Sequence, residues 1–216
     1  MNDSNANQAK ARDQVMEDFL SDLASDKPAP GGGSAAAVAG ALSAALSAMV
    51  ANLTVGESGY EDVSDDYESL LSEANDLREE FLEAIAEDME AYNRVMDAYR
   101  APRDTQEDKE SRRVQLQKAL KGATKPPLKM AELAKEVLDL SRECAKTGNS
   151  HAVTDAGASA ILAEAATRTA LLNVDINLGS ITDDEFVSKT EKRRKELEEG
   201  AISSASEVVE LMNEKL

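Results

Sequence analysis

Aromatic side chains are scarce in this sequence, which has no Trp and only 3% Phe and Tyr among its 216 residues. Without large rings, the core has to be built from Ala, Leu, Val and Met packed at short distance. Strands favour aromatic and β-branched residues, so this composition suits helices better than sheets. We expect residues 1–216 to form one domain of the all-α class, a multihelical bundle of long antiparallel helices.

Cysteine and histidine are nearly absent, since Cys144 and His151 are the single residues of their kinds. One cysteine cannot form a disulfide within the chain, and one thiol with one imidazole makes a poor zinc site. A ferritin-like metal bundle needs Glu-x-x-His pairs, which one histidine cannot supply. We therefore expect no bound metal. The first ten residues, MNDSNANQAK, lack the apolar run of a signal peptide, which predicts a cytoplasmic protein.

Basic residues are outnumbered, with 24 Lys and Arg against 42 Asp and Glu and a formal net charge of -18. Such a surface repels nucleic acids and anionic membranes, so neither is expected as a partner. An excess of surface acid over an otherwise ordinary core indicates adaptation to high intracellular salt, which screens the repulsion between like charges.

Residues 28–56, PAPGGGSAAAVAGALSAALSAMVANLTVG, carry no charge at all. Their prolines and glycines predict a turn, and the helix that follows would be capped by Ser34. Small or amide side chains recur at every fourth position of that helix, at Ala36, Gly40, Ala44, Ala48 and Asn52. They give it a smooth face for close packing that ends in a buried amide. The Ala-, Gly- and Ser-rich run favours the central helix of a soluble bundle over a membrane span.

Three glycines precede this helix, Gly31, Gly32 and Gly33. They leave backbone N–H groups unpaired at the positive end of the helix dipole, which is a suitable place for an anion or a carbonyl-rich ligand. A glycine-rich turn can equally be a plain connector, and the sequence has neither a Walker lysine nor a GxGxxG spacing. Both interpretations stay open for residues 31–34.

Asp88 stands in the middle of the apolar stripe of a helix expected over residues 67–99. The other members of the stripe are Phe81, Ala84, Ile85, Ala91, Tyr92, Val95, Met96 and Tyr99. This spacing turns Asp88 toward the interior, where loss of water raises the pKa of a carboxyl toward neutrality, as a general acid or base requires. The alternative is an Asp paired with an Arg or Lys of another helix.

Apolar spacing and helix breakers predict the remaining helices. The first spans residues 12–25. A segment over residues 112–123 is interrupted or kinked at Pro126 and Pro127 and continues over residues 128–146. A polar junction, residues 149–155, leads into a small-residue helix that ends at Leu178 and Gly179, and a final amphipathic helix covers residues 182–216.

Four segments occur in the chain in this order: residues 28–54, EDMEAYNRVMDAYRAP, KPPLKMAELA and TGNSHAVTDAGASAILAEAATRTALLNVDINL. Together they cover most of the chain and resemble the formiminotetrahydrofolate cyclodeaminase / methenyltetrahydrofolate cyclohydrolase family. The resemblance implies an all-helical homodimer that binds tetrahydrofolate in a groove near the dimer interface, without a permanently bound cofactor. Members either release ammonia from formiminotetrahydrofolate or interconvert methenyl- and formyltetrahydrofolate with water, and the sequence leaves the two reactions open.

The resemblance also places site residues on this chain by position. Asp88 is the first choice as catalytic proton carrier and Asp155 the second. The implied substrate-binding residues are Gly31, Gly32, Gly33, Ser34, Asn52, Asn149, Asn173 and Asn177. The chain departs from the family pattern at Pro126, His151 and Asp175.

Three of these residues share one predicted helix, and each has a plainer alternative. Asp155 falls in its first turn and fits a hydrogen-bond acceptor for a pterin-like amine, or simple stabilisation of the helix start. Asn173 lies roughly 27 Å further along, so the two cannot touch one reacting carbon. Asn173 and Asn177 would meet the other end of a long ligand, serve a second site in a partner chain, or bond between helices. His151 is either an exposed cap residue or a participant in proton transfer.

A non-enzymatic class competes with the enzyme, namely an acidic helical scaffold or a folate-binding protein. Charge, length and periodicity fit both. The coincidence of GGGS, Asn52 and an acid on an apolar face favours the enzyme. The small-residue faces of the helices over residues 34–54 and 149–179 exceed what one chain should leave uncovered, which predicts a homodimer with these helices at or beside the interface.

Overall fold

The computed structural model describes residues 16–216, which form α-helices, two short 3-10 helices and loops, with no β-strand in that range. In chain order they are α2 (Met16–Leu23), α3 (Gly32–Thr54), η1 (Glu61–Val63), α4 (Ser64–Arg100), α5 (Gln106–Ala123), α6 (Lys125–Thr147), η2 (Ser150–Ala152), α7 (Val153–Leu178) and α8 (Asp184–Asn213). The predicted all-α class is confirmed. Residues 12–15 of the expected first helix lie outside the described range.

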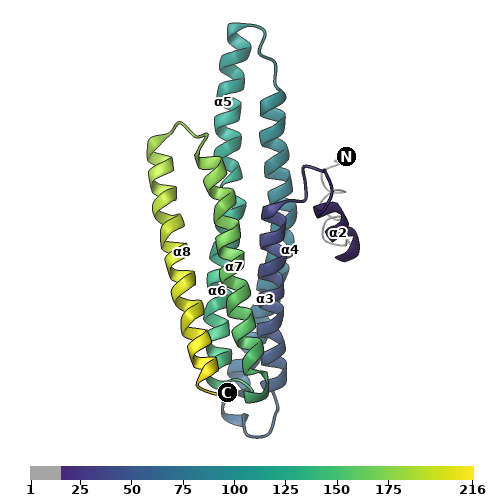
Figure 1. Cartoon of the computed structure of the whole chain (residues 1–216), viewed down its shortest axis with the longest axis vertical. Helices are drawn as coiled ribbons and strands as arrows, with labels where there is room; N and C mark the ends of the chain where they lie inside the picture. The colour runs from purple at the N-terminus through teal and green to yellow at the C-terminus, as the bar shows by residue number, and fades with distance from the viewer. Residues whose placement is uncertain (1–15) are drawn as a thin grey trace.

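The long helices run side by side along the long axis of the molecule (Figure 1). α3 packs against α4 and α7, and α6 packs against α7 and α8. α5 and α6 follow each other along the length of α4, and α4 and α5 rise above the rest as a hairpin (Figure 1). The predicted interruption is confirmed, because Thr124 separates the two helices and Pro126 and Pro127 stand in the first turn of α6, where proline fits.

Close packing of α3 depends on its small residues, as the four-residue repeat predicts. Ala36, Ala44 and Ala48 are buried, and a Cβ atom on Gly40 would overlap the ring of Phe81 on α4. The prediction of a buried Asn52 amide is wrong. Asn52 is exposed in the last turn of α3, and its side chain donates to the carbonyl oxygen of Ala48 at 3.1 Å. Because the amide forms this hydrogen bond within its own helix, it needs no partner from another helix.

The start of α3 also differs from the prediction. Gly31 is the N-cap residue and the helix begins at Gly32, so two of the glycines form part of the first turn. Ser34 is therefore not a cap but the third residue of the helix, and it is fully buried. Extended backbone at Gly31 ends the turn without a capping side chain, which leaves the first N–H groups of α3 uncapped.

A polar cluster joins α3, α6 and α7 in the core, a feature that the sequence analysis did not single out. Its members are Ser43, Ser47, Ser141 and Ser159, all fully buried. Ser43 Oγ donates to the carbonyl oxygen of Ser159 at 2.7 Å, and Ser159 Oγ donates back to that of Ser43 at 2.8 Å. Ser47 and Ser141 Oγ lie 2.9 and 2.8 Å from Ser159 Oγ. Because every hydroxyl has a partner, the cluster fixes the register of the three helices.

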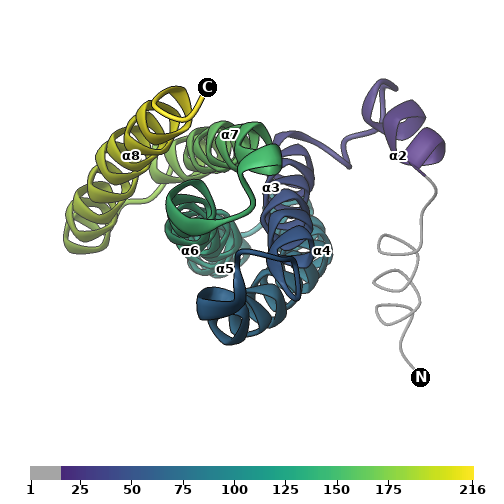
Figure 2. The same ribbon diagram turned by 90° about the horizontal axis from the view of Figure 1, so that it is seen from below.

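Seen end-on, α3 lies between α4 and α7, whereas α2 stands to one side of the bundle (Figure 2). Within residues 16–216, α3 alone is long and apolar enough, by length and composition, to cross a membrane. Most of that helix is buried against its neighbours, as expected for the central helix of a bundle.

Candidate active site

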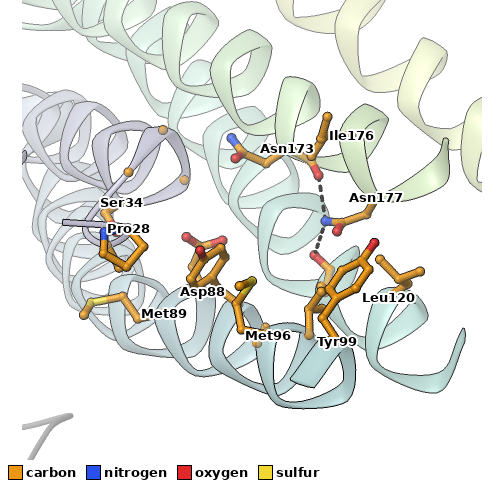
Figure 3. A pocket seen from close by; sticks show the side chains of 18 of the residues that line it. Pro28, Ser34, Asp88, Met89, Met96, Tyr99, Leu120, Asn173, Ile176 and Asn177 are labelled. Carbon is orange, nitrogen blue, oxygen red and sulfur yellow. Dashed lines mark hydrogen bonds between the residues drawn. The ribbon is translucent and has the colours of Figure 1, made fainter. Parts of the chain in front are cut away.

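A cavity of about 460 Å³ opens where the N-terminus of α3 meets the second half of α4 and the C-terminal part of α7. Its lining combines the glycine turn, Asp88 and two carboxamides with apolar side chains of α4, α5 and α7 (Figure 3). The cavity therefore gathers seven of the residues expected in the site, namely Gly31, Gly32, Gly33, Ser34, Asp88, Asn173 and Asn177.

Asp88 supplies the carboxyl group of the cavity. It has no Lys or Arg partner within residues 16–216, so the structure gives no support to the alternative of a structural ion pair. Burial removes water from the carboxyl and raises its pKa to about 6. At this pKa, both the protonated and the ionised form of the carboxyl are present near neutral pH, so Asp88 can accept or release a proton.

The glycine turn lies directly against this carboxyl. A Cβ atom on Gly33 would overlap the carboxylate of Asp88, so only glycine at this position admits the acid to the start of α3. A Cβ atom on Gly32 would meet the side chain of Asn173 at 3.5 Å, an ordinary contact. Of the two glycines inside the helix, Gly33 is thus the one that the site geometry requires.

Ser34 brings an unused hydroxyl to the same corner. Its Oγ atom is the one buried side-chain nitrogen or oxygen without a hydrogen-bond partner in the described part of the chain. An unsatisfied buried hydroxyl costs free energy unless something else pairs with it. Ser34 lines the cavity beside the α3 N-terminus, so a bound polar ligand is the partner that would satisfy it.

Asn173 and Asn177 form the opposite wall, one turn apart on α7 (Figure 3). Asn173 Nδ2 donates to the carbonyl oxygen of Thr169 at 3.0 Å, and Asn177 Nδ2 donates to those of Asn173 and Ala123 at 2.8 and 3.1 Å. The bond to Ala123 ties α7 to the end of α5, which is the interhelical role left open by the sequence. Both Oδ1 atoms lack a partner within residues 16–216 and can accept from a ligand.

The apolar wall of the cavity comes from residues that the sequence analysis assigned to helix packing. Tyr92, Val95, Met96 and Tyr99 belong to the predicted stripe of α4 but line the cavity. Tyr99 is 43% exposed, and the guanidinium of Arg112 lies 5.8 Å from its ring centre. The stripe continues three turns past Asp88 because it serves a ligand surface as well as the core. The length of this stripe, with two tyrosines in a chain poor in aromatic residues, was the sequence feature that could have indicated a ligand surface.

The remaining predicted site residues lie at the other end of α3, about 30 Å from the glycine turn by helix rise. Asn149 ties the junction before α7 to this end, since its Nδ2 donates to the carbonyl oxygen of Leu53 at 2.7 Å. Asn52 lies one residue away from Leu53, and Asp155 stands in the first turn of α7. Within one chain, the structure does not bring Asn52, Asn149 or Asp155 to the cavity. His151 belongs to the same distant junction and is exposed.

Similarity to known proteins agrees with this geometry. Residues 15–196 match the family model described as formiminotransferase-cyclodeaminase. The chain belongs to this family. It is 41% identical to methenyltetrahydrofolate cyclohydrolase of Methylorubrum extorquens, over 94% of this chain and 96% of that protein. Formimidoyltransferase-cyclodeaminase of Rattus norvegicus is 30% identical over 91% of this chain, which spans only 36% of that longer protein.

A solved structure has the same architecture. Formiminotetrahydrofolate cyclodeaminase of Thermotoga maritima superimposes with a TM-score of 0.84 at 30% identity, covering 92% of this chain and 96% of that one. The family named by the sequence resemblance is thereby confirmed, together with its helical fold.

The raised pKa of Asp88 predicts a pH-dependent cost to stability. The folded chain binds this proton more tightly than the unfolded chain does, so the contribution of Asp88 to stability is lost as pH rises from about 4 to about 6. Asp88→Asn should therefore have a free energy of unfolding about 1–3 kcal/mol higher than that of the parent at pH 7.5, measured by urea unfolding. Near pH 4 the two free energies of unfolding should be equal. Asp97→Asn, an exposed position on the same helix, is the control. Parallel pH profiles for Asp88→Asn and the parent would refute this prediction.

Proposed function

We propose that this chain is a methenyltetrahydrofolate cyclohydrolase in which Asp88 takes the proton from the attacking water. The observation that carries the proposal is a desolvated carboxyl, without an ion-pair partner in the described chain and with a pKa of about 6, in a cavity beside a helix N-terminus. Full-length similarity to a protein named for this reaction supports the choice.

The geometry suits both steps of the hydrolysis. Water adds to the cationic methenyl carbon and its proton passes to the Asp88 carboxylate, which also attracts the cation. The resulting adduct opens when one C–N bond breaks: the protonated Asp88 returns its proton to the departing nitrogen, and the hydroxyl group of the adduct loses its own proton to solvent as the formyl C=O bond forms. The uncapped N–H groups of α3 and the Ser34 hydroxyl supply donors for the oxygen of the adduct. These steps need only proton transfer and hydrogen bonds.

Cyclodeamination is the second candidate, supported by the similarity to proteins named as cyclodeaminases. In that reaction, the nitrogen that does not carry the formimino group attacks the formimino carbon and loses its proton, and the amine leaves as ammonia after protonation. Asp88 would then act first as an acid. The two reactions therefore depend on opposite protonation states, so hydrolysis should rise and ammonia release should fall as pH increases through about 6.

Replacing the proton carrier should separate catalysis from binding. Asp88→Asn keeps the size of the side chain but cannot transfer a proton, so turnover of methenyltetrahydrofolate should fall roughly 100- to 10,000-fold with little change in substrate affinity. The reaction is followed by loss of the near-ultraviolet absorbance of the methenyl group, with Asp97→Asn as the matched control. Normal turnover by Asp88→Asn would overturn the proposed role of this residue.

We also propose that the enzyme is a homodimer joined through α3 and α7. These adjacent helices carry six of the large apolar side chains that the single chain leaves exposed, namely Leu42, Met49, Leu53, Ile161, Leu172 and Ile176. On each helix their spacing places them along one stripe. Ile176 also lines the cavity, so a second copy on this face would lie beside the site. Because one chain does not bring Asn52, Asn149 or Asp155 to the cavity, these residues would have to come from a second copy to reach it.

Charge placed on this stripe should separate the protomers. Leu42→Asp combined with Leu172→Asp introduces unpaired carboxylates into the proposed interface, so light scattering should give half the parent mass while circular dichroism stays helical. Ile202→Asp on α8, which is also exposed, should leave the parent mass unchanged. A parent protein that is already monomeric at high salt would contradict the proposal.

A further inference from the structure

One tyrosine of the cavity wall is held from outside the cavity by an arginine of the next helix. Tyr99 lies in the last turn of α4 and lines the cavity (Figure 3). Arg112 belongs to the second turn of α5 and is not among the residues that line the cavity. Any function of Arg112 in the site would therefore have to act through Tyr99.

Arg112 contacts Tyr99 at two places. Its Nε and Nη2 atoms donate to the carbonyl oxygen of Tyr99 at 3.2 and 3.1 Å, and its guanidinium lies over the tyrosine ring, 5.8 Å from the ring centre. This carbonyl is one of the last four of α4, which have no hydrogen-bond partner within the helix. One planar guanidinium thus satisfies the end of α4 and fixes the direction of the ring.

The start of α5 keeps Arg112 in place for this contact. Thr105 and Asp108 form a capping box, in which each side chain accepts a hydrogen bond from the backbone N–H of the other residue. The capping box fixes the first turn of α5, one turn before Arg112. Arg112 forms no ion pair in the part of the chain that the structure describes, so no carboxylate draws its guanidinium away from Tyr99.

Aromatic rings are scarce in this chain, which makes the position of Tyr99 informative. The 216 residues include four Tyr and three Phe, and both Tyr92 and Tyr99 line the cavity. Tyr99 is 43% exposed and lies roughly 16 Å along α4 from Asp88 by helix rise. A guanidinium over one face of the Tyr99 ring leaves the other face for a flat ring of a ligand.

We propose that Tyr99 packs against a flat ring of the folate substrate and that Arg112 is the residue that positions Tyr99 for this contact. The proposal rests on the proposed function, because it takes the reacting carbon of a folate to lie at Asp88. A folate has a ring on each side of its one-carbon unit, the pterin on one side and the benzoyl ring on the other. Whichever ring extends along α4 from Asp88 would lie at Tyr99.

The first measurement tests the hold on the ring without a ligand. Because the chain has no Trp, its near-ultraviolet circular dichroism reports immobilised tyrosines. The difference between the parent and Tyr99→Phe gives the contribution of Tyr99. Arg112→Lys keeps the charge but loses the planar pair of donors, so it should lose most of this contribution while the far-ultraviolet signal stays helical. Arg100→Lys, the same substitution at an exposed position beside Tyr99, is the control and should retain it.

Two spectroscopic results would contradict the proposal. If Tyr99→Phe gives the spectrum of the parent, the Tyr99 ring is not immobilised. If Arg112→Lys gives the spectrum of the parent, Arg112 is not the residue that holds the ring.

The second measurement is a double-mutant cycle on the binding of 5-formyltetrahydrofolate, followed by titration calorimetry. Tyr99→Leu and Arg112→Lys should each weaken binding roughly 3- to 10-fold, and Tyr99→Phe, which keeps the ring, should bind more tightly than Tyr99→Leu. Because Arg112 acts through the ring, Arg112→Lys/Tyr99→Leu should bind no more weakly than Tyr99→Leu alone. Additive losses would mean that Arg112 meets the ligand itself and would overturn the inference. Parent affinity in Tyr99→Leu would overturn it as well.

Displacement of this ligand by two half molecules, 6-methyltetrahydropterin and p-aminobenzoylglutamate, identifies the ring at Tyr99. The half that loses affinity in Tyr99→Leu contains that ring, and unchanged affinity for both halves would overturn the proposed contact. None of these measurements needs turnover. Failure to hydrolyse methenyltetrahydrofolate would therefore count against the proposed function alone.

Discussion

The close approach of the Asp88 carboxyl to the first turn of α3 is the contact on which the site depends. It requires two conditions at once. Asp88 must replace an apolar residue on the buried stripe of α4, and Gly33 must lack a side chain. Desolvation then raises the pKa of the acid, while the neighbouring uncapped N–H groups and the Ser34 hydroxyl provide donors. An acid, donors and a cavity thus arise at one junction of two helices.

The rest of the fold holds this junction in place. Gly40 lets α3 and α4 pack at the distance set by the ring of Phe81, which is two turns from Asp88 on the same helix. The serine cluster fixes α3 against α6 and α7, and Asn177 ties α7 to the end of α5. These contacts are satisfied inside the protein, so they hold the helices in place without using the Asp88 carboxyl or the Ser34 hydroxyl, which remain available to a ligand.

Periodicity was enough to predict the helices and the inward position of Asp88, because both follow from repeats within a single segment. The local sequence left the glycine turn open between a ligand site and a plain connector, because the contact of Gly33 is with a residue more than fifty positions away and has no local signature. Ser34 resembled a cap because glycine was not expected inside the first turn. The amide of Asn52 was placed inside from its register alone, although the end of α3 is open to solvent.

The sequence also could not predict which of the marked residues lie at the same end of the bundle. The family resemblance marked residues at both ends of α3 and α7. Helix rise already separates Asp155 from Asn173, and the three-dimensional structure adds that Asn52 and Asn149 lie with Asp155 at the end away from the cavity. Tyr92, Met96 and Tyr99 were assigned to packing because a stripe that lines a cavity has the same spacing as one that faces a helix.

A direct titration of the Asp88 carboxyl tests the central claim. Difference infrared spectra of the parent and Asp88→Asn isolate the carboxyl band of this residue, which can be followed from about pH 3 to 8. The structure predicts a midpoint at about 6, set by desolvation beside the start of α3. A midpoint near 3.9, the ordinary value of an aspartic acid, would contradict it, because the carboxyl would then be solvated and unsuited to carry the proton.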